Sequence, residues 1–270
     1  MTIASLPMYD LEPIREVTDA WWSAVAASLR GHGLKDVPDR LDRGAFADRF
    51  AQWSSPDLLL SQTCGYPLTH DFADKLRLVA TPRYSAPYCE DASYCSVVLV
   101  REDSIAQTIE DMRGTRVAVN GFDSQSGFNA LRALVAPHAE DSRFFREVLE
   151  TGRHHASMQA VGSGKADLCA IDCVTYALTL KHLPGLAEGT RALTMTEPAP
   201  NLPYVTHVGR GDDEVEALRS ALQQCACDPT LSGVRNTLML DGFAILPRSA
   251  YDRIDAMERE AAEAGYPDLK

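Results

Sequence analysis

Short apolar runs that alternate with helical patterns constrain the fold of this chain more than any other feature. The run Ile3–Leu6 ends at Pro7 and reads as a buried strand. Apolar residues then recur every three or four positions from Ile14 to Leu29, and Gly31 ends this pattern. A strand followed by a helix is the unit from which α/β folds are built, so we expect an α/β protein with mainly parallel sheets.

The same alternation continues along the chain. Apolar and β-branched runs predict strands at Leu58–Ser61, Leu76–Ala80, Ser96–Val100, Arg116–Asn120, Leu168–Ile171, Leu193–Thr196 and Tyr204–His207. Helical patterns occupy Gly127–Val135, Val174–His182, Asp213–Cys227 and Arg248–Ala264. No repeat of solenoid period is present.

Two irregular segments divide the chain. Residues 81–93 contain two prolines and form an irregular stretch. Residues 197–203 contain three, which exclude regular structure there. We therefore predict a discontinuous first lobe of residues 1–84 and 205–270. Residues 85–204 form an inserted second lobe, and the two crossings form a hinge.

Charge and composition exclude several classes of protein. The net charge is −12 and the pI is near 5.0, opposite to the basic surface that nucleic-acid binding requires. No apolar run approaches the ~18 residues of a membrane span. The N-terminus lacks the pattern of a signal peptide, which predicts a cytoplasmic protein, or a periplasmic one if the sequence is a mature form.

The cysteines do not predict a metal site. Seven are present, an odd number, and they lack zinc-ribbon spacing. The pairs Cys169/Cys173 and Cys225/Cys227 are weak candidates for ligands or redox pairs. We expect buried thiols in a reducing compartment, with no metal and no cofactor.

The strongest local motif lies between a predicted strand and a predicted helix, at Asn120–Asn129. Ser124 and Ser126 can cap the helix and donate outward, while free backbone N–H groups and the helix dipole favour an anion. Gly127 would let a ligand approach the backbone. An ordinary serine N-cap explains the same residues. The motif is not a P-loop, because it lacks the Gly-Lys-Ser/Thr ending.

Two further segments carry candidate polar groups. His154 and His155 precede another helix and could both donate to an anion, or form a solvated pair. Asp172 ends a buried strand, where it could accept a hydrogen bond from a ligand or cap the following helix. Tyr9, Tyr66 and Tyr94 follow or precede strands; each phenol could line a ligand or simply pack in a loop.

Together these motifs resemble the phosphate/phosphonate substrate-binding family of ABC transporters. The resemblance runs in order through Gln62–Tyr66, Arg116–Gly127, Gly152–Ser157, Ala170–Asp172 and Leu202–Thr206. It implies a type 2 periplasmic-binding-protein fold, in which two α/β lobes joined by two crossings close on a ligand.

The resemblance also implies roles for particular residues. It places the phosphonate-group contact on Ser124, Gln125 and Ser126, with Gly127 opening the helix. Tyr66 and Tyr94 take the places of cleft tyrosines, and Asp172 that of a cleft carboxylate. Members that hold an aminoalkyl phosphonate have an acidic residue where this sequence has His155, which argues against an amine-bearing ligand.

Three functions follow as hypotheses. The first is a binding protein for a small phosphate- or phosphonate-like oxoanion, with an ABC permease as a possible partner, in which Asp172 would favour an oxoanion that keeps a proton. The second is an enzyme of the same fold that acts on a phosphorylated metabolite, with His154 or His155 as general base. The third is a sensory domain that acts on a separate partner.

Overall fold

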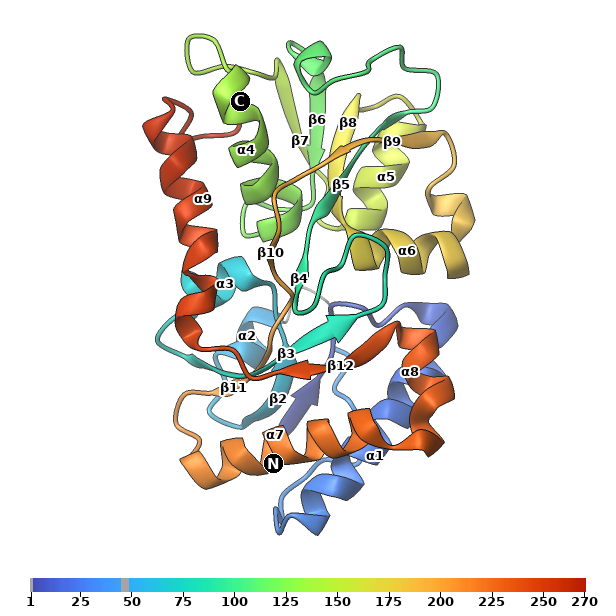
Figure 1. Cartoon of the computed structure of the whole chain (residues 1–270), viewed down its shortest axis with the longest axis vertical. Coiled ribbons are helices and arrows are strands. Elements are labelled where there is room, and N and C mark those ends of the chain that lie inside the picture. The colour runs from blue at the N-terminus through green and yellow to red at the C-terminus, as the bar shows by residue number, and fades with distance from the viewer. Residues whose placement is uncertain (1, 45–48) are drawn as a thin grey trace. The chain divides into compact units, whose positions relative to one another are not determined.

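The computed structural model describes residues 2–44 and 49–270, and these form two compact units (Figure 1). Unit 1 contains the described residues up to 85, residues 90–92 and residues 200–250. Unit 2 contains residues 86–89, 93–199 and 251–270. Within the described ranges, no helix is both long enough and apolar enough to cross a membrane.

Unit 1 is built on a five-stranded sheet in the order β1-β2-β11-β3-β12. Its strands are β1 (Ile3–Ser5), β2 (Leu58–Gln62), β3 (Leu76–Tyr84), β11 (Tyr204–His207) and β12 (Leu240–Ala244). Its helices are η1 (Glu12–Ile14), α1 (Arg15–Gly31), α2 (Arg49–Trp53), α3 (Gly65–Thr69), α7 (Asp212–Cys227), η7 (Pro229–Leu231) and α8 (Ser232–Leu238). The 3₁₀ turn η8 (Arg248–Tyr251) ends the unit.

Helix α1 shows how the sequence pattern becomes a core. The predicted three-to-four spacing is confirmed, because Trp21, Val25 and Leu29 are all buried. Trp21 also stacks on Phe243 of β12 with ring centroids 6.2 Å apart. Burial of these large apolar side chains holds α1 on the sheet.

Unit 2 is built on a second five-stranded sheet in the order β7-β6-β8-β5-β9. Its strands are β5 (Ser96–Arg101), β6 (Arg116–Val119), β7 (Glu147–Glu150), β8 (Leu168–Asp172) and β9 (Thr190–Met195); β4 (Ser93–Tyr94) and β10 (Ala199–Pro200) form a separate two-stranded ladder. Its helical elements are η3 (Glu110–Met112), the π-helical turn η4 (Gln125–Asn129), α4 (Ala130–Val135), η5 (Ala136–His138), α5 (His154–Gly162), α6 (Cys173–His182), η6 (Pro184–Leu186) and α9 (Asp252–Glu263).

The sheets are mixed, whereas we predicted mainly parallel ones. Strands β1 and β2 are parallel, as are β6 and both of its neighbours. Strand β11 runs antiparallel to β2 and β3, and β5 runs antiparallel to β8 and β9. A helical crossover makes neighbouring strands parallel, but β11 reaches its place directly from the other unit through the Pro-rich segment, without such a crossover.

The C-terminal segment belongs to unit 2, whereas we predicted residues 205–270 in the first lobe. Figure 1 shows α9, in red, beside α4. Ala261, Tyr266 and Leu269 are buried in a core cluster with Leu131 of α4. The chain therefore also passes between the units before residue 251, a passage that we did not predict.

Candidate functional site

The carboxyl ends of three parallel strands meet at one edge of the unit 2 sheet. Strands β7, β6 and β8 are neighbours in that order. A polar segment follows β6 at residues 120–124, another follows β7 at residues 151–153, and Asp172 is the last residue of β8. Because carboxyl ends of parallel strands share an edge, the fold brings the predicted motifs together.

The serine turn, residues 120–127, begins the helical segment after β6. Ser124 has extended backbone angles and is the N-cap, and its Oγ accepts a hydrogen bond from the Gly127 N–H at 3.1 Å. The Ser126 carbonyl accepts a hydrogen bond from Ser96 Oγ on β5 at 3.0 Å. The turn is thus closed by the Ser124 side chain and fixed to the sheet through the Ser126 backbone.

His154 joins the serine turn to the end of β8. Its Nε2 lies 3.0 Å from Ser126 Oγ and 3.4 Å from Asp172 Oδ2. The other carboxylate oxygen, Oδ1, accepts the Thr175 N–H at 2.8 Å and caps α6. Asp172 therefore caps α6, which is one of the two roles that the sequence left open; its contact with a ligand stays a prediction.

Burial disfavours the charged form of His154. Desolvation lowers the pKa of His154 below its usual 6.5; the charge on Asp172 opposes this shift, and that on His155 adds to it. Because the Asp172 carboxylate only accepts hydrogen bonds, the ring hydrogen belongs on Nε2. Nδ1 is then an acceptor, and it is buried with no hydrogen-bond partner among the described residues.

Two serine hydroxyls lie side by side in this arrangement. Ser124 Oγ accepts from the Gly127 N–H, and Ser126 Oγ accepts from the Nε2–H of His154. Each hydroxyl also has a hydrogen of its own to donate. The two oxygens are hydrogen-bonded to each other at 3.4 Å, so an anion that accepts from both hydroxyls would replace this bond.

Gln125 and His155 do not join this cluster with their side chains. Gln125 Nε2 lies 3.1 Å from the sulfur of Met257, and its Oε1 accepts from Asn129 Nδ2 at 2.7 Å. His155 Nε2 lies 3.1 Å from Thr179 Oγ1 on α6. The described contacts of both side chains are therefore with the surrounding helices, rather than with Ser126.

Gly127 is explained by packing within the protein. A Cβ placed there would lie 1.8 Å from Asn120 Oδ1 and 3.2 Å from Cε1 of His154. We expected this glycine to admit a ligand, but the space beside it is filled by these two side chains. Asn120 was missing from the predicted site residues, although it directly follows the β6 strand.

The three candidate tyrosines lie in different places. Tyr94 is buried in unit 2, two residues before Ser96. Tyr9 and Tyr66 lie in unit 1, after the parallel strands β1 and β2. Tyr9 packs edge-on against Tyr84 with ring centroids 5.3 Å apart, and Tyr66 stacks on His70 at 3.8 Å.

Ser96 was also missing from the predicted site residues. It is the register partner of Asp172 across β5 and β8, which places it beside the serine turn. The apolar run that begins with this serine did predict a strand. The antiparallel pairing that brings it to Asp172 was not predicted.

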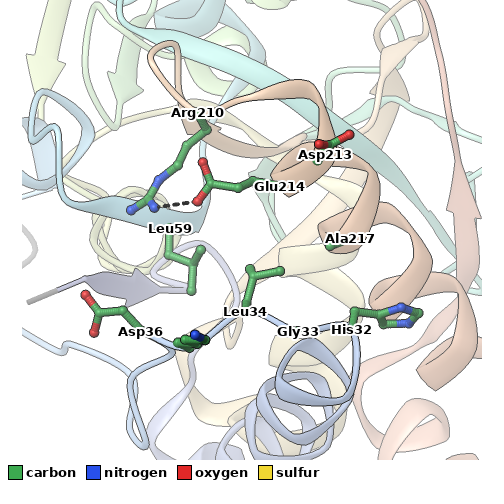
Figure 2. A pocket seen from close by; sticks show the side chains of 10 residues that line it. His32, Gly33, Leu34, Asp36, Leu59, Arg210, Asp213, Glu214 and Ala217 are labelled. Carbon is green, nitrogen blue, oxygen red and sulfur yellow. Dashed lines mark hydrogen bonds and ion pairs between the residues drawn. The ribbon is translucent and has the colours of Figure 1, made fainter.

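A separate cavity of about 360 Å³ lies in unit 1, between the end of α1 and the start of α7 (Figure 2). Arg210 and Glu214 form an ion pair on its wall at 2.9 Å, and the other Arg210 nitrogens donate to the carbonyls of Leu58 and Asp57. This arginine is therefore already engaged within the protein. Among the described residues, no group of three or more His, Cys, Asp or Glu could hold a metal ion.

Comparison with a family model gives a match over most of the chain. Residues 55–251 match the family described as "ABC transporter, phosphonate, periplasmic substrate-binding protein". No curated protein matches the chain in sequence.

Solved structures share the fold at low sequence identity. A binding-protein component of an ABC phosphonate transporter from Pseudomonas aeruginosa has a TM-score of 0.77 at 14% identity, covering 98% of this chain and 87% of that one. PhnD1 from Prochlorococcus marinus, in complex with methylphosphonate, has a TM-score of 0.76 at 15% identity, covering 97% and 98%. XAC2383 from Xanthomonas citri, bound to chloride, has a TM-score of 0.72 at 14% identity, covering 98% of both chains. The predicted two-lobed α/β fold of periplasmic binding proteins is thus confirmed.

Proposed function

Because the chain belongs to the family of periplasmic substrate-binding proteins of phosphonate ABC transporters, we propose that it binds a small phosphonate- or phosphate-like oxoanion at Ser124 and Ser126. The observation that carries this proposal is the pair of adjacent, buried serine hydroxyls at the serine turn. Ser124 Oγ accepts the Gly127 N–H, and Ser126 Oγ accepts from His154 when the ring hydrogen is on Nε2. The hydroxyls also share a hydrogen bond of 3.4 Å, and both can donate to an anion that replaces it. An oxoanion is the partner that accepts several such donors at once.

The negative net charge of the protein does not oppose this binding. Uncharged donors act over hydrogen-bond distance, whereas net charge acts diffusely and is screened beyond ~8 to 10 Å at physiological salt. Asp172 adds selectivity in our proposal, since its carboxylate accepts a hydrogen bond from a P–OH group and repels a fully ionised oxygen. We therefore expect phosphonate and phosphate to bind more tightly than sulfate.

The relatives suggest the first ligand to test. PhnD1 from Prochlorococcus marinus was solved in complex with methylphosphonate. Methylphosphonate carries the tetrahedral acid group that we propose for this site, and it lacks the amine that the His155 position argues against. Tyr9, Tyr66 and Tyr94 remain proposed ligand residues, as do Gln125, Gly127, His154, His155 and Asp172.

We propose binding without catalysis. A serine–histidine–aspartate triad needs the carboxylate on one ring nitrogen and the hydroxyl on the other. Here Ser126 and Asp172 both meet Nε2 of His154, so no carboxylate orients the ring from Nδ1. Release of phosphate from phosphorylated metabolites, lost in His154→Ala, would contradict this part of the proposal.

We also propose that the protein acts in the periplasm with an ABC permease, as the family description indicates. This agrees with the second of the two locations that the sequence left open. Fractionation of cells that express the native gene tests the location. Ligand-dependent co-purification with a membrane component tests the partner.

The binding site is tested by isothermal titration with methylphosphonate. Ser126→Ala removes one charge-assisted hydrogen bond and should weaken binding about 10- to 100-fold. Ser163→Ala is a matched control, because Ser163 lies at the end of α5 and its hydroxyl donates only to the Ala160 carbonyl in the described contacts. Equal affinities of the two variants would place the site elsewhere, and tighter binding of sulfate than of methylphosphonate would refute the role of Asp172.

A further inference from the structure

Three cysteines of unit 2 gather beside the carboxyl end of β8. Cys89 Sγ lies 3.4 Å from Cys173 Sγ, although 84 positions separate them in the chain. Cys95 contacts Cys173 as well, and its carbonyl accepts the Cys173 N–H at 3.0 Å. The sequence had suggested Cys169 as the partner of Cys173, but Cys169 is fully buried within the sheet.

The three thiols differ in accessibility. Cys89 is partly exposed, while Cys95 and Cys173 are buried. The thiol of Cys95 donates to the Tyr88 carbonyl at 3.7 Å. A hydrogen bond with Cys173, together with burial, raises the pKa of Cys95 far above its usual 9.0. An oxidant in solution therefore meets Cys89 first, and Cys173 is the thiol in contact with it.

The segment that carries Cys89 is constrained. Tyr88 and Asp91 both have positive φ, 68° and 51°, which side chains other than glycine rarely adopt. On the other side of the pair, Cys173 is the first residue of α6 and follows Asp172 directly. A covalent bond here would join this segment to the start of α6.

We propose that Cys89 and Cys173 form a reversible disulfide when the protein meets hydrogen peroxide. The Cys89 thiolate attacks the peroxide, which gives a sulfenic acid and hydroxide. The Cys173 sulfur then bonds to Cys89 and water leaves, so that two thiols lose two electrons and two protons while peroxide becomes two waters. The sulfur atoms must approach by about 1.4 Å to reach the ~2.05 Å of a disulfide bond.

The disulfide regulates anion binding in this proposal, which here rests on the proposed function. Asp172 reaches His154 with one oxygen and caps α6 with the other. Fixing the next residue to Cys89 restricts the movement of that cap. We expect the affinity for methylphosphonate to differ at least threefold between the oxidised and reduced protein, with the reduced affinity restored by dithiothreitol.

The test begins with the full chain and needs no anion. Reduced protein is treated with hydrogen peroxide at low excess, denatured and titrated for free thiols. The count should fall from seven to five, and digestion without reductant should give one linked peptide that joins Cys89 to Cys173. A closed loop of this length should also raise the melting temperature by about 5 to 15 °C.

Serine variants identify the thiols involved. Cys89→Ser and Cys173→Ser should each prevent the linked peptide, whereas Cys227→Ser, which removes an exposed thiol, should not. The proposal is overturned by an unchanged count of seven, by a Cys95–Cys173 peptide, or by a sulfinic acid on Cys89 without a linked peptide.

Anion binding is measured separately on the same samples. If the disulfide forms but the affinities of the two states agree within threefold, the regulatory part is wrong and the covalent part stands. If neither state binds methylphosphonate, the proposed function has failed while the thiol count still decides the disulfide.

Discussion

Gly127 is the residue whose replacement tests the packing of the serine turn. A Cβ at this position would meet Asn120 Oδ1 at 1.8 Å and press on His154. Asn120 must rotate away, and the ring must shift by a few tenths of an ångström. We expect Gly127→Ala to lower the free energy of unfolding by about 1 to 2 kcal/mol.

A double-mutant cycle separates this contact from a general effect of alanine. In an Asn120→Ala background the obstacle is gone, so Gly127→Ala should cost at least about 0.5 kcal/mol less. Urea unfolding of the four proteins measures the difference. Additive costs would show that the contact with Asn120 does not explain the glycine.

His154 and His155 predict the pH dependence of stability near neutrality. Burial is the largest cause that lowers the pKa of each, and both face Asp172, which opposes the shift. The unfolded chain therefore takes up protons at about pH 6.5, before the folded protein does. The contribution of these histidines to stability is therefore complete above pH 6.5 and is lost as the pH falls below it. The free energy of unfolding decreases by at most about 1.4 kcal/mol per pH unit for each proton taken up.

Urea unfolding between pH 7.5 and 5.5 measures how steeply the free energy of unfolding changes with pH. His154→Gln keeps an N–H donor but does not titrate, so its stability should depend less on pH than that of the parent protein. If the slopes of His154→Gln and the parent protein agree, His154 is not the group that titrates.

At the scale of elements, α9 and α4 are joined by a buried arginine. The side chain of Arg132 is 4% exposed, and its guanidinium lies 3.1 Å from Glu258 of α9 and donates to Asn129 at 2.6 Å. Asn129 in turn donates to the Ile254 carbonyl at 3.0 Å. These contacts connect the helix behind the serine turn to the end of the chain.

We expect Arg132→Ala to lower the free energy of unfolding by about 2 to 4 kcal/mol, because it leaves Glu258 and Asn129 without this donor. Arg253→Ala is the matched control. It removes an exposed ion pair with Glu260 within α9 and should cost less than about 1 kcal/mol. Equal costs, measured by urea unfolding, would contradict the structural role of Arg132.

Much of this arrangement was predictable from the sequence, and the rest depends on long-range pairing. Polar residues after β6, β7 and β8 gather because parallel strands end at one edge. The apolar runs predicted β6 and β8, whereas β7, with the sequence Glu-Val-Leu-Glu, was not predicted. The partner of α9 was not predictable, since an amphipathic pattern shows that a face is buried but not against what. Likewise, no local spacing joins Asn120 to Gly127, Ser96 to Asp172, or Cys89 to Cys173.

For the whole molecule, the last residues complete unit 2 rather than unit 1. Tyr266 and Leu269 are buried in the unit 2 core, and the amides of Phe144 and Phe145 both donate to the Lys270 carbonyl. All three tryptophans, Trp21, Trp22 and Trp53, lie in unit 1. Tryptophan fluorescence therefore reports on unit 1 alone.

We expect a chain that ends at Ala250 to lose unit 2 selectively. Its tryptophan emission should remain that of buried side chains, because the unit 1 core is intact. Stabilisation by methylphosphonate should disappear, and a dye that binds exposed apolar surface should now bind, because removal of the C-terminal segment uncovers the core around Leu131. If the emission shifts to that of exposed tryptophan, unit 1 depends on unit 2 for its fold, and the division into two compact units does not extend to their stability.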